Sequence, residues 1–420
     1  MNPPAPVTRT LPEGTMSVSA TTESLSLPAV STSRRDAAST SGRPEGPLSL
    51  ARRAAGRVKR RVLGGAPVIP RRTIGSREYA SLTGAVWREV EPALPIERRP
   101  PVRYGKLPGD FDRRVATRFP EMGVLELPEG MLVSRRGWVV TRDGYLLPDH
   151  SLLAGSKELP VGGAEMRVHR LPGVAASLVS DHAWWNYGHF LYDGLGRFEL
   201  LRRAGYTIEG IDRFVCAYPG RKARRLLERL GIPDSKIVEV ETGRTIQADL
   251  LLAPTFPGSR RDHPRWLIDF LRRELVPVGS AEGPLRRLYA QRSKTRRVAN
   301  EQEILPILAS YGFETFDPDE HDEPLAAFAR AEAVVGVHGA NLADICFCPE
   351  GAKILELTPT DHISSYWWAQ AEMAGLDHAY IVCQSTGERS SERARKADVD
   401  VRVDPDDLRQ GLAALLGRPG

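Results

Sequence analysis

The feature that most constrains the fold is a regular alternation of apolar runs and helical patterns along residues 211–383. The first part of this alternation predicts strands 211–218, 236–241 and 248–254 and helices 221–233 and 263–275. Strands that alternate with helices form parallel sheets covered by helices on both faces. We therefore expect an α/β fold built on parallel sheets.

A second series follows residues 276–284, whose Gly, Pro and Ser content is that of a linker. It predicts strands 286–292, 313–318, 333–337, 353–357 and 377–383 and helices 300–312, 323–331, 340–348 and 364–375. Two such series separated by a linker predict two Rossmann-like domains that face a cleft.

Residues 1–78 differ from the rest of the chain in composition and charge. They contain no aromatic residue and carry 13 Lys and Arg against 5 Asp and Glu, a net charge of +8, whereas the whole chain is +5. Such a segment buries too little apolar surface to offset the entropy of ordering, so we expect a disordered basic tail. Within it, residues 48–63 could form a basic amphipathic helix on an anionic membrane or remain a solvated linker.

The remaining features of composition concern the structure of residues 79–175 and the cellular compartment of the protein. Residues 79–175 contain short alternating apolar runs separated by Gly and Pro, which predicts strands and hairpins. No apolar run is long enough for a membrane-spanning helix, and no basic start precedes an apolar core as in a secretory signal. Four scattered cysteines predict buried, reduced thiols. These features favour a cytoplasmic protein.

The stretch NYGHFLYDGLGRF, residues 186–198, places two ionisable side chains in a strongly apolar run. Asn186 is a suitable N-cap, and Gly205 is placed to end the helix. His189 and Asp193 are four residues apart, so they share one face of that helix. A carboxylate beside an imidazole fixes the ring tautomer and raises the basicity of the other ring nitrogen, as a general base requires. The alternative is a buried histidine that the aspartate satisfies for packing reasons.

A second constellation lies in AVVGVHGANLADICFCPEGAKILEL. The buried strand AVVGV ends in His338, Gly339, Ala340 and Asn341 and passes into a helix. Ligands of open α/β sheets bind at the carboxyl ends of strands, and the free N–H groups of a helix N-terminus suit a phosphate. Glu356, near the carboxyl end of the next strand, could hold the hydroxyl groups of a ribose. The alternative is an ordinary strand–turn–helix unit that His338 caps.

The third constellation is YAQRSKTRRVANE, residues 289–301. A predicted strand ends at Arg292, and Arg296 and Arg297 follow in a loop. Guanidinium groups suit the oxygens of a diphosphate, so we expect Arg292 and Arg297 to bind one. A plain basic surface loop is the alternative.

These three blocks, in this order and at these separations, resemble glycosyltransferase family 61, which includes proteins of the capsular polysaccharide biosynthesis type. The resemblance covers about residues 120–385, and GVHGANLADICFCPEGAKILEL is its most specific part. It implies a GT-B architecture and an inverting hexosyl- or pentosyltransferase. Such an enzyme moves a sugar from a nucleotide-sugar donor to a glycan or polysaccharide acceptor. Asn341 and Asp344 depart from the usual residues of the family, which leaves the donor open, a uridine diphosphate sugar being one candidate.

On this resemblance, residues 79–280 form an acceptor-side domain with an irregular β-rich start. Residues 281–400 form a nucleotide-sugar-binding Rossmann-like domain, and residues 401–420 form a C-terminal helix. His189 is the general base, supported by Asp193. The substrate-binding residues are Asn186, Arg292, Arg297, His338, Gly339, Ala340, Asn341 and Glu356. We expect no cofactor and no metal, because arginines and a helix N-terminus can neutralise the leaving diphosphate.

Two other classes of protein remain open on the residues themselves. A His/Asp metal-dependent hydrolase would use His189, Asp193 and His338 and would contain stoichiometric metal. A non-catalytic glycan- or nucleotide-binding protein would keep the same scaffold without transferring sugar. Nucleic acid is not an expected partner, because only the tail is basic. Peripheral contact with the inner face of the membrane through that tail is a further expectation.

Overall fold

The computed structural model describes residues 72–111, 118–151, 167–241, 244–259, 262–280, 282–387 and 399–417. The predicted tail up to residue 71, with the basic helix at 48–63, therefore lies outside the described residues. Residues 72–78, which we assigned to the tail, form strand β1 (Arg72–Thr73) and the beginning of helix α2 (Ser76–Thr83). Ile74 in this segment is buried, so folded structure begins before the predicted tail boundary at residue 78.

The first sheet has ten strands, and four of them form a parallel group. These four are β10 (Arg167–Ser177), β11 (Arg213–Cys216), β12 (Ile237–Glu239) and β13 (Arg244–Pro254). Strand β10 lies between β11 and β13, with Ala176 opposite both Phe214 and Leu252. This parallel pairing confirms the strand–helix series expected for residues 211–275.

The N-terminal strands extend this sheet as antiparallel hairpins, as the alternating pattern predicts. They are β2 (Trp87–Glu91), β6 (Met122–Pro128), β7 (Met131–Val133), β8 (Trp138–Val140) and β9 (Tyr145–Leu146). Strands β6 and β7 both pair with β13, and β7, β8 and β9 follow one another as a meander. The β-rich start of the chain is therefore continuous with the parallel strands.

Three helices of the first half follow the predicted order. They are α4 (Leu195–Arg203), α5 (Arg221–Arg229) and α6 (Arg265–Leu275), and the short 3₁₀ turns are η1 (Pro148–His150) and η3 (Asp234–Lys236). Gly231, just beyond α5, has a φ of 78°, a backbone conformation that glycine adopts at low cost, so it ends the helix.

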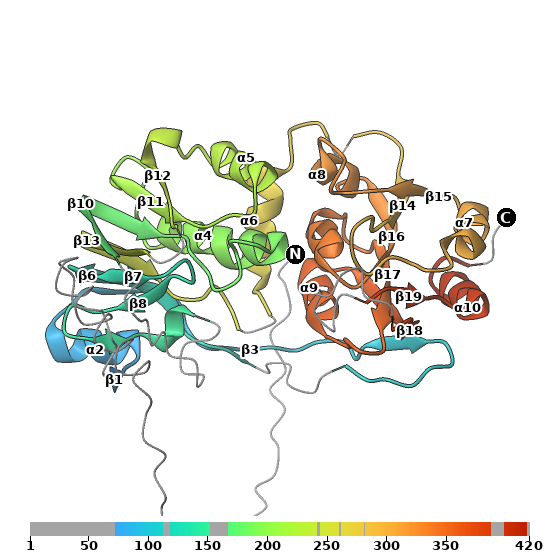
Figure 1. The fold of residues 1–420 in the computed structure, drawn as a ribbon, viewed down its shortest axis with the longest axis horizontal. Helices are drawn as coiled ribbons and strands as arrows, with labels where there is room; N and C mark the ends of the chain where they lie inside the picture. The colour runs from blue at the N-terminus through green and yellow to red at the C-terminus, as the bar shows by residue number, and fades with distance from the viewer. Residues whose placement is uncertain are drawn as a thin grey trace, which may run out of the picture. The chain divides into compact units, whose positions relative to one another are not determined.

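The second sheet is parallel through five strands, and their helices lie on both of its sides. The parallel strands run in the order β15 (Phe313–Phe316), β14 (Arg286–Ala290), β16 (Ala331–Val337), β17 (Lys353–Pro359) and β18 (Asp377–Ser385). The edge strand is β19 (Val401–Arg402), and the helices are α7 (Glu301–Ser310), α8 (Pro324–Phe328), α9 (Tyr366–Ala374) and α10 (Pro405–Leu416). Figure 1 shows α7 and α10 on one side of this sheet and α8 and α9 on the other. The predicted helix at 340–348 is instead the 3₁₀ helix η4 (Ala340–Phe347).

One N-terminal segment does not stay with the first sheet. Strand β4 (Val102–Tyr104) pairs in parallel with β18, Arg103 lying opposite Tyr380. The flanking Arg99 also forms an ion pair with Glu372 of α9. Strands β3 (Leu94–Pro95) and β5 (Arg118–Phe119), which precede and follow β4 in the sequence, form a small antiparallel pair. A boundary at residue 280 therefore does not separate the two sheets completely.

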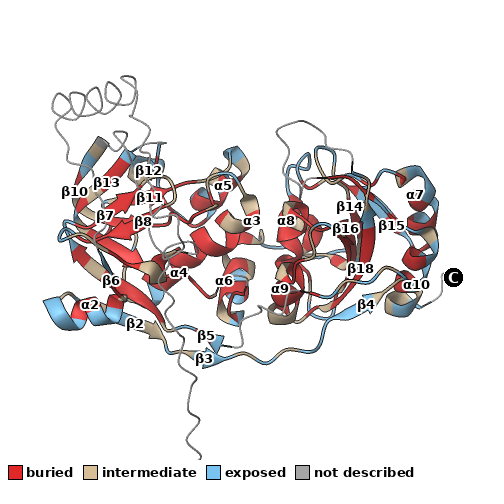
Figure 2. Ribbon diagram, turned by 60° about the horizontal axis from the view of Figure 1, so that its bottom comes forward, coloured by how far each residue is buried: buried red, intermediate tan, exposed pale blue. Residues whose placement is uncertain are grey.

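A layer of helices between the two sheets carries much of the core. Figure 2 shows α4, α8 and α9 largely buried, and α6 buried along one face. One apolar cluster joins residues of both halves, including Phe214 and Phe270 from the first and Val334, Ile354 and Trp367 from the second. By contacts, all described residues belong to one compact unit, residues 55–420. The fold is thus α/β with parallel sheets, while the GT-B arrangement and the domain limits stay predictions.

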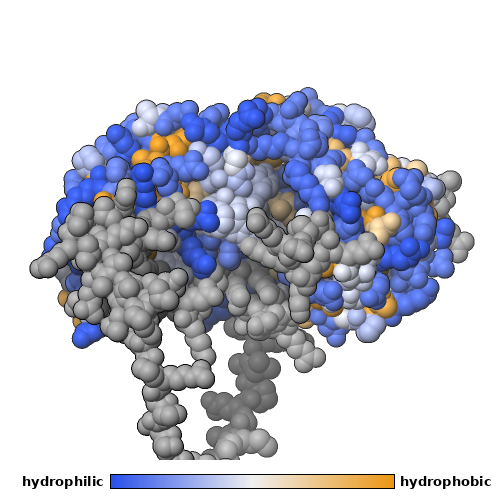
Figure 3. All heavy atoms as spheres, viewed as in Figure 1, coloured by the Kyte–Doolittle hydropathy of each residue, from blue (hydrophilic) through white to orange (hydrophobic). Residues whose placement is uncertain are grey.

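Few large apolar side chains of the described residues are exposed. On the face shown in Figure 3, hydrophobic residues form small groups in a mostly hydrophilic surface. The exposed large apolar residues are Leu82, Val86, Leu94, Val102, Trp185, Val278 and Leu285. In the described part of the chain, no helix has the length and apolarity needed to cross a bilayer. The four cysteines are free and buried, which confirms the prediction for them.

Candidate active site

The stretch from Asn186 to Arg203 is not the single α-helix that the sequence predicts. Asn186 is indeed the N-cap, and its side-chain oxygen accepts the backbone N–H of His189 at 3.2 Å. One turn of α-helix, α3 (Tyr187–His189), is followed by the π-helical turn η2 (Phe190–Gly194), and only then does α4 begin. Single π turns occur mostly inside helices at functional sites. Both candidate catalytic residues lie at this irregularity.

The glycines of the stretch are explained by close packing. A Cβ atom at Gly196 would lie 2.2 Å from Leu267 Cδ1 of α6, and one at Gly194 would lie 3.3 Å from the carbonyl oxygen of Leu178. Atoms cannot approach as closely as 2.2 Å, so only glycine lets α4 approach α6 at this point. The π turn and its neighbours are held tightly against the core.

His189 and Asp193 form the predicted pair. Nδ1 of His189 lies 2.7 Å from Oδ2 of Asp193, and the Asp193 side chain is almost fully buried. The His189 side chain keeps 22% of its surface exposed, so its ring is partly accessible. Ser180 donates its hydroxyl to the same carboxylate oxygen at 3.2 Å. The pair therefore leaves Nε2 of His189 as the ring nitrogen that a substrate could meet.

The charges of this pair support each other. Burial works against a charged Asp193, but the charge and hydrogen bond of His189, with a bond from His263, hold the pKa of Asp193 well below its ordinary value. Burial also works against protonated His189, yet the Asp193 carboxylate outweighs it and raises the pKa of His189 above 6.5. A carboxylate that stays ionised and raises the basicity of an imidazole is the arrangement of a general base.

Aromatic and imidazole rings surround the exposed edge of His189. The ring centroid of His182 lies 4.9 Å from that of His189, and the ring of Tyr366 lies at 6.1 Å. Burial and the nearby His189 lower the pKa of His182, which favours its neutral form. Trp185 packs edge-on to His182 and is 37% exposed. An exposed indole beside a candidate base is a surface on which a sugar ring can stack.

Two residues behind the pair were not found from the sequence. His263, in the segment before α6, places Nε2 2.9 Å from Oδ1 of Asp193. Gln370 of α9 places its amide nitrogen 3.0 Å from Nδ1 of His263. The sequence separations are 70 and 107 residues, so no local pattern links them. The only signal was a His–Pro pair at the start of a predicted helix.

At the carboxyl end of β16, His338 also meets a carboxylate. Its Nδ1 lies 2.5 Å from Oε1 of Glu356, and the other oxygen of Glu356 lies 2.9 Å from Nε2 of His378. Glu356 has no exposed surface. We expected Glu356 to hold a ribose, but both of its oxygens are bonded to histidines in the interior. Its position is that of a residue that orients His338.

The electrostatics of this second cluster differ from those of the first. Burial lowers the pKa of His338 below 6.5, with Arg296 and Arg292 acting in the same direction and Glu356 against it. Burial would raise the pKa of Glu356, but His338 and His378 lower it to about 2. His338 is therefore neutral at pH 7, whereas Glu356 is ionised.

Arg292 and Asn341 lie together at the turn after His338. Asn341 donates to the carbonyl oxygen of Ala290 at the end of β14, and its side-chain oxygen accepts a bond from Nη1 of Arg292 at 2.9 Å. A Cβ atom at Gly339 would lie 2.1 Å from the same Nη1, so glycine is needed for the arginine to lie there. The structure thus brings Arg292 and residues 338–341 together at neighbouring strand ends.

Arg297 does not reach this turn. It is paired with Asp400, the distance from Nη2 to Oδ2 being 2.7 Å. Its neighbour Arg296 reaches the turn instead, and Nη1 of Arg296 donates to the carbonyl oxygen of His338 at 2.7 Å. Arg296 has a φ of 54°, a left-handed backbone conformation that is uncommon for residues other than glycine. These bonds favour Arg296 over Arg297 at this turn, and the expectation that Arg297 binds the diphosphate stays a prediction.

Contacts between the halves connect the two clusters. The hydroxyl of Tyr187, next to the π turn, donates to Asp344 of η4 at 2.9 Å, and the hydroxyl of Tyr192 donates to the carbonyl oxygen of Ala343 at 2.8 Å. On α9, Tyr366 packs near His189, and the adjacent Trp367 lies 6.3 Å from His338. Both histidines are thus placed against one helix.

The hydrolase alternative needs a set of metal ligands. Across the described ranges, no group of three or more His, Cys, Asp or Glu residues could hold a metal ion. His338 bonds to Glu356 instead of joining His189 and Asp193. The described residues therefore give this alternative no ligand set.

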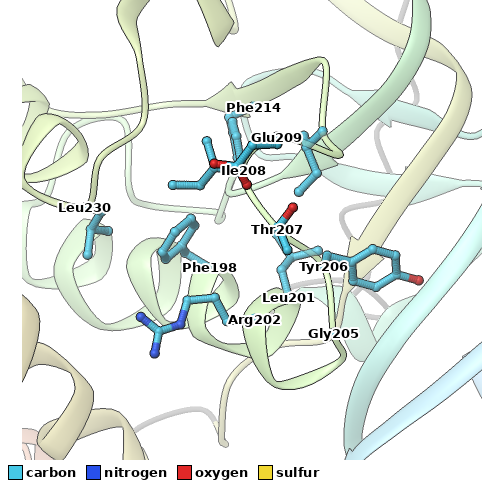
Figure 4. Close-up of a pocket in the computed structure, with 11 residues that line it drawn as sticks. Phe198, Leu201, Arg202, Gly205, Tyr206, Thr207, Ile208, Glu209, Phe214 and Leu230 are labelled. Carbon is cyan, nitrogen blue, oxygen red and sulfur yellow. The ribbon is translucent and has the colours of Figure 1, made fainter.

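A small cavity borders these residues, and a larger one lies at the end of α4. A cavity of about 130 Å³ between α5 and η4 is lined in part by Tyr187, Lys222, Ala340 and Asp344. Burial raises the pKa of Asp344 there to about 7. A larger cavity of about 390 Å³, shown in Figure 4, lies at the end of α4, with Phe198, Arg202 and Ile208 in its wall. It contains none of the predicted site residues.

The fold and the site define an α/β protein with a carboxylate-supported imidazole and a separate turn, reached by arginines, at parallel strand ends. Residues 187–355 match the family Glycosyltransferase 61, so over this region the chain is similar to a family of glycosyltransferases. This match confirms the resemblance that the three sequence blocks indicated. It includes all predicted site residues except Asn186 and Glu356, which border it.

Three curated proteins are similar to part of the chain, and all bear the name protein O-linked-mannose β-1,4-N-acetylglucosaminyltransferase 2. The protein from Bos taurus is 34% identical over 125 residues, which cover 27% of this chain and 21% of that protein. Those from Canis lupus familiaris and Mus musculus are each 32% identical over 120 residues, 26% of this chain and 20% of theirs. The chain thus aligns with about a fifth of the length of these animal relatives.

Proposed function

We propose that the protein is an inverting glycosyltransferase that moves a sugar from a nucleotide-sugar donor to a glycan acceptor. The observation that carries this proposal is the His189–Asp193 pair on the π turn, inside the region that matches a glycosyltransferase family. An inverting transfer needs one base on the acceptor side and positive potential on the donor side. The two clusters described above suit these two needs.

In the proposed reaction, Nε2 of His189 accepts the proton of the acceptor hydroxyl. The acceptor oxygen forms a bond to the anomeric carbon of the donor sugar, and the bond from that carbon to the diphosphate oxygen breaks. The electron pair of that bond leaves with the nucleoside diphosphate. Asp193 stabilises the imidazolium that forms, because its low pKa keeps it ionised throughout.

The proposed diphosphate site is the turn at residues 338–341 with Arg292 and Arg296. Arg292 is held by Asn341, and Arg296 by the carbonyl oxygen of His338, so both guanidinium groups are fixed at the turn. Guanidinium groups suit phosphate, since they bind its oxygens in a bidentate manner. Neutral His338 would offer hydrogen bonds to the donor without adding charge. We propose that this transfer requires neither cofactor nor metal.

The proposed acceptor surface includes Trp185, whose exposed indole lies beside His182 near the base. The relatives are named for transfer of N-acetylglucosamine to O-linked mannose, so N-acetylglucosamine is a reasonable first donor sugar and a mannose glycoside a first acceptor. Polysaccharide acceptors, cytoplasmic location and membrane contact through the basic tail remain part of the proposal.

The test combines ligand binding with product analysis. The protein is first screened by thermal shift against nucleoside diphosphates, because a ligand that binds only the folded state raises the melting temperature. It is then incubated with the matching nucleotide sugars and with sugar acceptors, and the anomeric configuration of any product is determined. Transfer with inversion supports the proposal. If the protein binds a diphosphate but neither transfers sugar to any acceptor nor hydrolyses any donor, a non-catalytic binding protein is favoured.

A further inference from the structure

The side of Asp193 that faces away from His189 is occupied by a second, completely buried imidazole. His263 has no exposed surface, and its Nε2 lies 2.9 Å from Oδ1 of Asp193. Its Nδ1 lies 3.0 Å from the amide nitrogen of Gln370, which is also fully buried. The four side chains form one continuous series of hydrogen bonds, from Gln370 through His263 and Asp193 to His189.

Asp193 and Gln370 together set which nitrogen of His263 carries the proton, because an ionised carboxylate only accepts hydrogen bonds. An amide nitrogen is only a donor, so the Nδ1 atom that faces it must be the acceptor. The proton of His263 is then on Nε2, which donates to Asp193. Asp193 therefore receives one N–H bond on each oxygen, from His263 on Oδ1 and from His189 on Oδ2.

We propose that His263, set in this tautomer by Asp193 and Gln370, is a positioning residue that holds Asp193 and thereby orients and tunes His189. The proposal rests on the proposed function, in which His189 is the base. His263 touches no reacting atom, so its effect passes entirely through Asp193.

The need for such a residue follows from the position of Asp193. Its backbone belongs to a π turn and its side chain would be free to rotate about the terminal bond if one oxygen had no partner. A donor at each oxygen fixes the plane of the carboxylate, and with it the ring of His189. The hydroxyl of Ser180 alone shares Oδ2 with His189, so it cannot replace His263 at Oδ1.

The neighbouring ionisable groups affect the same pair. Asp193 and Asp181 both raise the pKa of His189, and burial lowers it. His182 faces the ring of His189, and Tyr366 lies near the rings of His189 and His263. Burial raises the pKa of Tyr366 well above 10. Against this background, removal of the His263 donor leaves more negative charge on Asp193, which favours protonated His189.

The experiment compares His263→Phe with His263→Gln in the full-length protein. The ring of His263 packs near Tyr192 and Phe256, so a phenyl ring keeps the packing while removing both nitrogens. Glutamine can still donate to Asp193 and accept from Gln370. The pKa of His189 is measured by NMR with isotope-labelled histidine, its signal among the nine histidines being assigned by its loss in His189→Gln. Transfer rates are measured across pH in parallel.

We expect His263→Phe to raise the pKa of His189 by roughly one unit and to move the acid limb of the pH–rate profile by the same amount. Its kcat should fall by about ten- to a hundredfold, the usual contribution of a partner that orients a functional group. His263→Gln should stay close to the parent in both measurements. A merely structural His263 would change the melting temperature of both variants and leave the pKa of His189 where the parent has it, which would overturn the proposal.

Gln370→Met provides a second route if the phenylalanine variant does not fold. Without the amide donor, the ring of His263 is held less firmly and donates to Asp193 less well, so the pKa of His189 should again rise. Gln247→Met is the matched control, because Gln247 donates only to the carbonyl oxygen of Glu129 and belongs to strand β13. An equal shift in both methionine variants would contradict the inference. The NMR measurement needs no turnover, so absence of sugar transfer would count against the proposed function alone.

Discussion

Asp193→Asn is the substitution for which the structure makes the strongest prediction. An asparagine has one acceptor oxygen and one donor nitrogen, whereas both oxygens of Asp193 accept N–H bonds. Gln370 keeps the proton of His263 on Nε2, so the amide oxygen of the introduced asparagine must face His263 and its nitrogen must face His189. His189 then has to accept on Nδ1, which moves its proton to Nε2. The nitrogen that would act as the base is already protonated.

The magnitude follows from the loss of the whole general-base contribution. General-base catalysis contributes roughly 10²–10⁴-fold in rate, or about 3–5 kcal/mol of transition-state stabilisation. We expect kcat of Asp193→Asn to fall by that factor, and His189→Ala to fall by a similar one. Donor affinity should hardly change in either variant, since the proposed diphosphate site lies at residues 338–341. The free energy of unfolding should fall by about 1–3 kcal/mol, because charge-assisted bonds to a buried carboxylate are replaced by weaker ones.

The assay measures kcat for sugar transfer at saturating donor, the donor dissociation constant by calorimetry, and the melting temperature. Asp193→Glu serves as the partner variant, since it keeps two acceptor oxygens but displaces them by one methylene group. If Asp193→Asn keeps more than a third of the parental kcat while its melting temperature falls, the pair is structural and the assignment of His189 as the base is refuted.

Three further predictions concern the donor site and pH. Arg296→Ala should weaken binding of a nucleoside diphosphate about tenfold or more, whereas Arg297→Ala should leave it nearly unchanged, as calorimetry would reveal; equal losses would contradict the assignment. Activity should fall as the pH drops through the raised pKa of His189, which lies above 6.5, because only the neutral ring accepts a proton; a flat profile between about pH 6 and 8 would count against this. The pKa of Glu356 is about 2 in the folded state against an ordinary 4.5. The stability that ionised Glu356 gives the folded state is therefore complete above pH 4.5 and is lost as the pH falls toward 2. Glu356→Gln should therefore lower the melting temperature at pH 7 and flatten its fall in that range, and a melting temperature equal to the parent's would show that the cluster contributes nothing.

Much of the fold could be predicted because its determinants are local. The apolar runs at 333–337 and 353–357 become β16 and β17, and Gly231 ends α5, since period and turn chemistry act over a few residues. The placement of β4 in the second sheet could not be predicted. Its three residues, Val102–Tyr104, carry no signal for a partner strand as distant in the sequence as β18.

Some features of the candidate site could likewise be predicted from local sequence, and others could not. His189 and Asp193 meet because they are one turn apart, which sequence spacing predicts. Which of Arg296 and Arg297 reaches the turn depends on the conformation of a loop, and spacing does not specify that. For Glu356, strand position predicts the edge of the sheet but not whether the side chain points to open space. His263 and Gln370 are brought in by packing of α6 and α9 against the π turn.

The two clusters have the same composition, a carboxylate between two histidines, but the pKa of the histidine that leads to the site is raised in one and lowered in the other. His189 keeps 22% of its side-chain surface exposed, whereas His338 keeps 8%. Greater burial, and the positive charges of Arg292 and Arg296, lower the pKa of His338, while Asp193 raises that of His189. A histidine with a raised pKa can take and hold the proton of an acceptor. A histidine that stays neutral beside two arginines can form a hydrogen bond to the nucleotide sugar without repelling their positive charge. Similar clusters could thus serve the two sides of one transfer, because their surroundings differ.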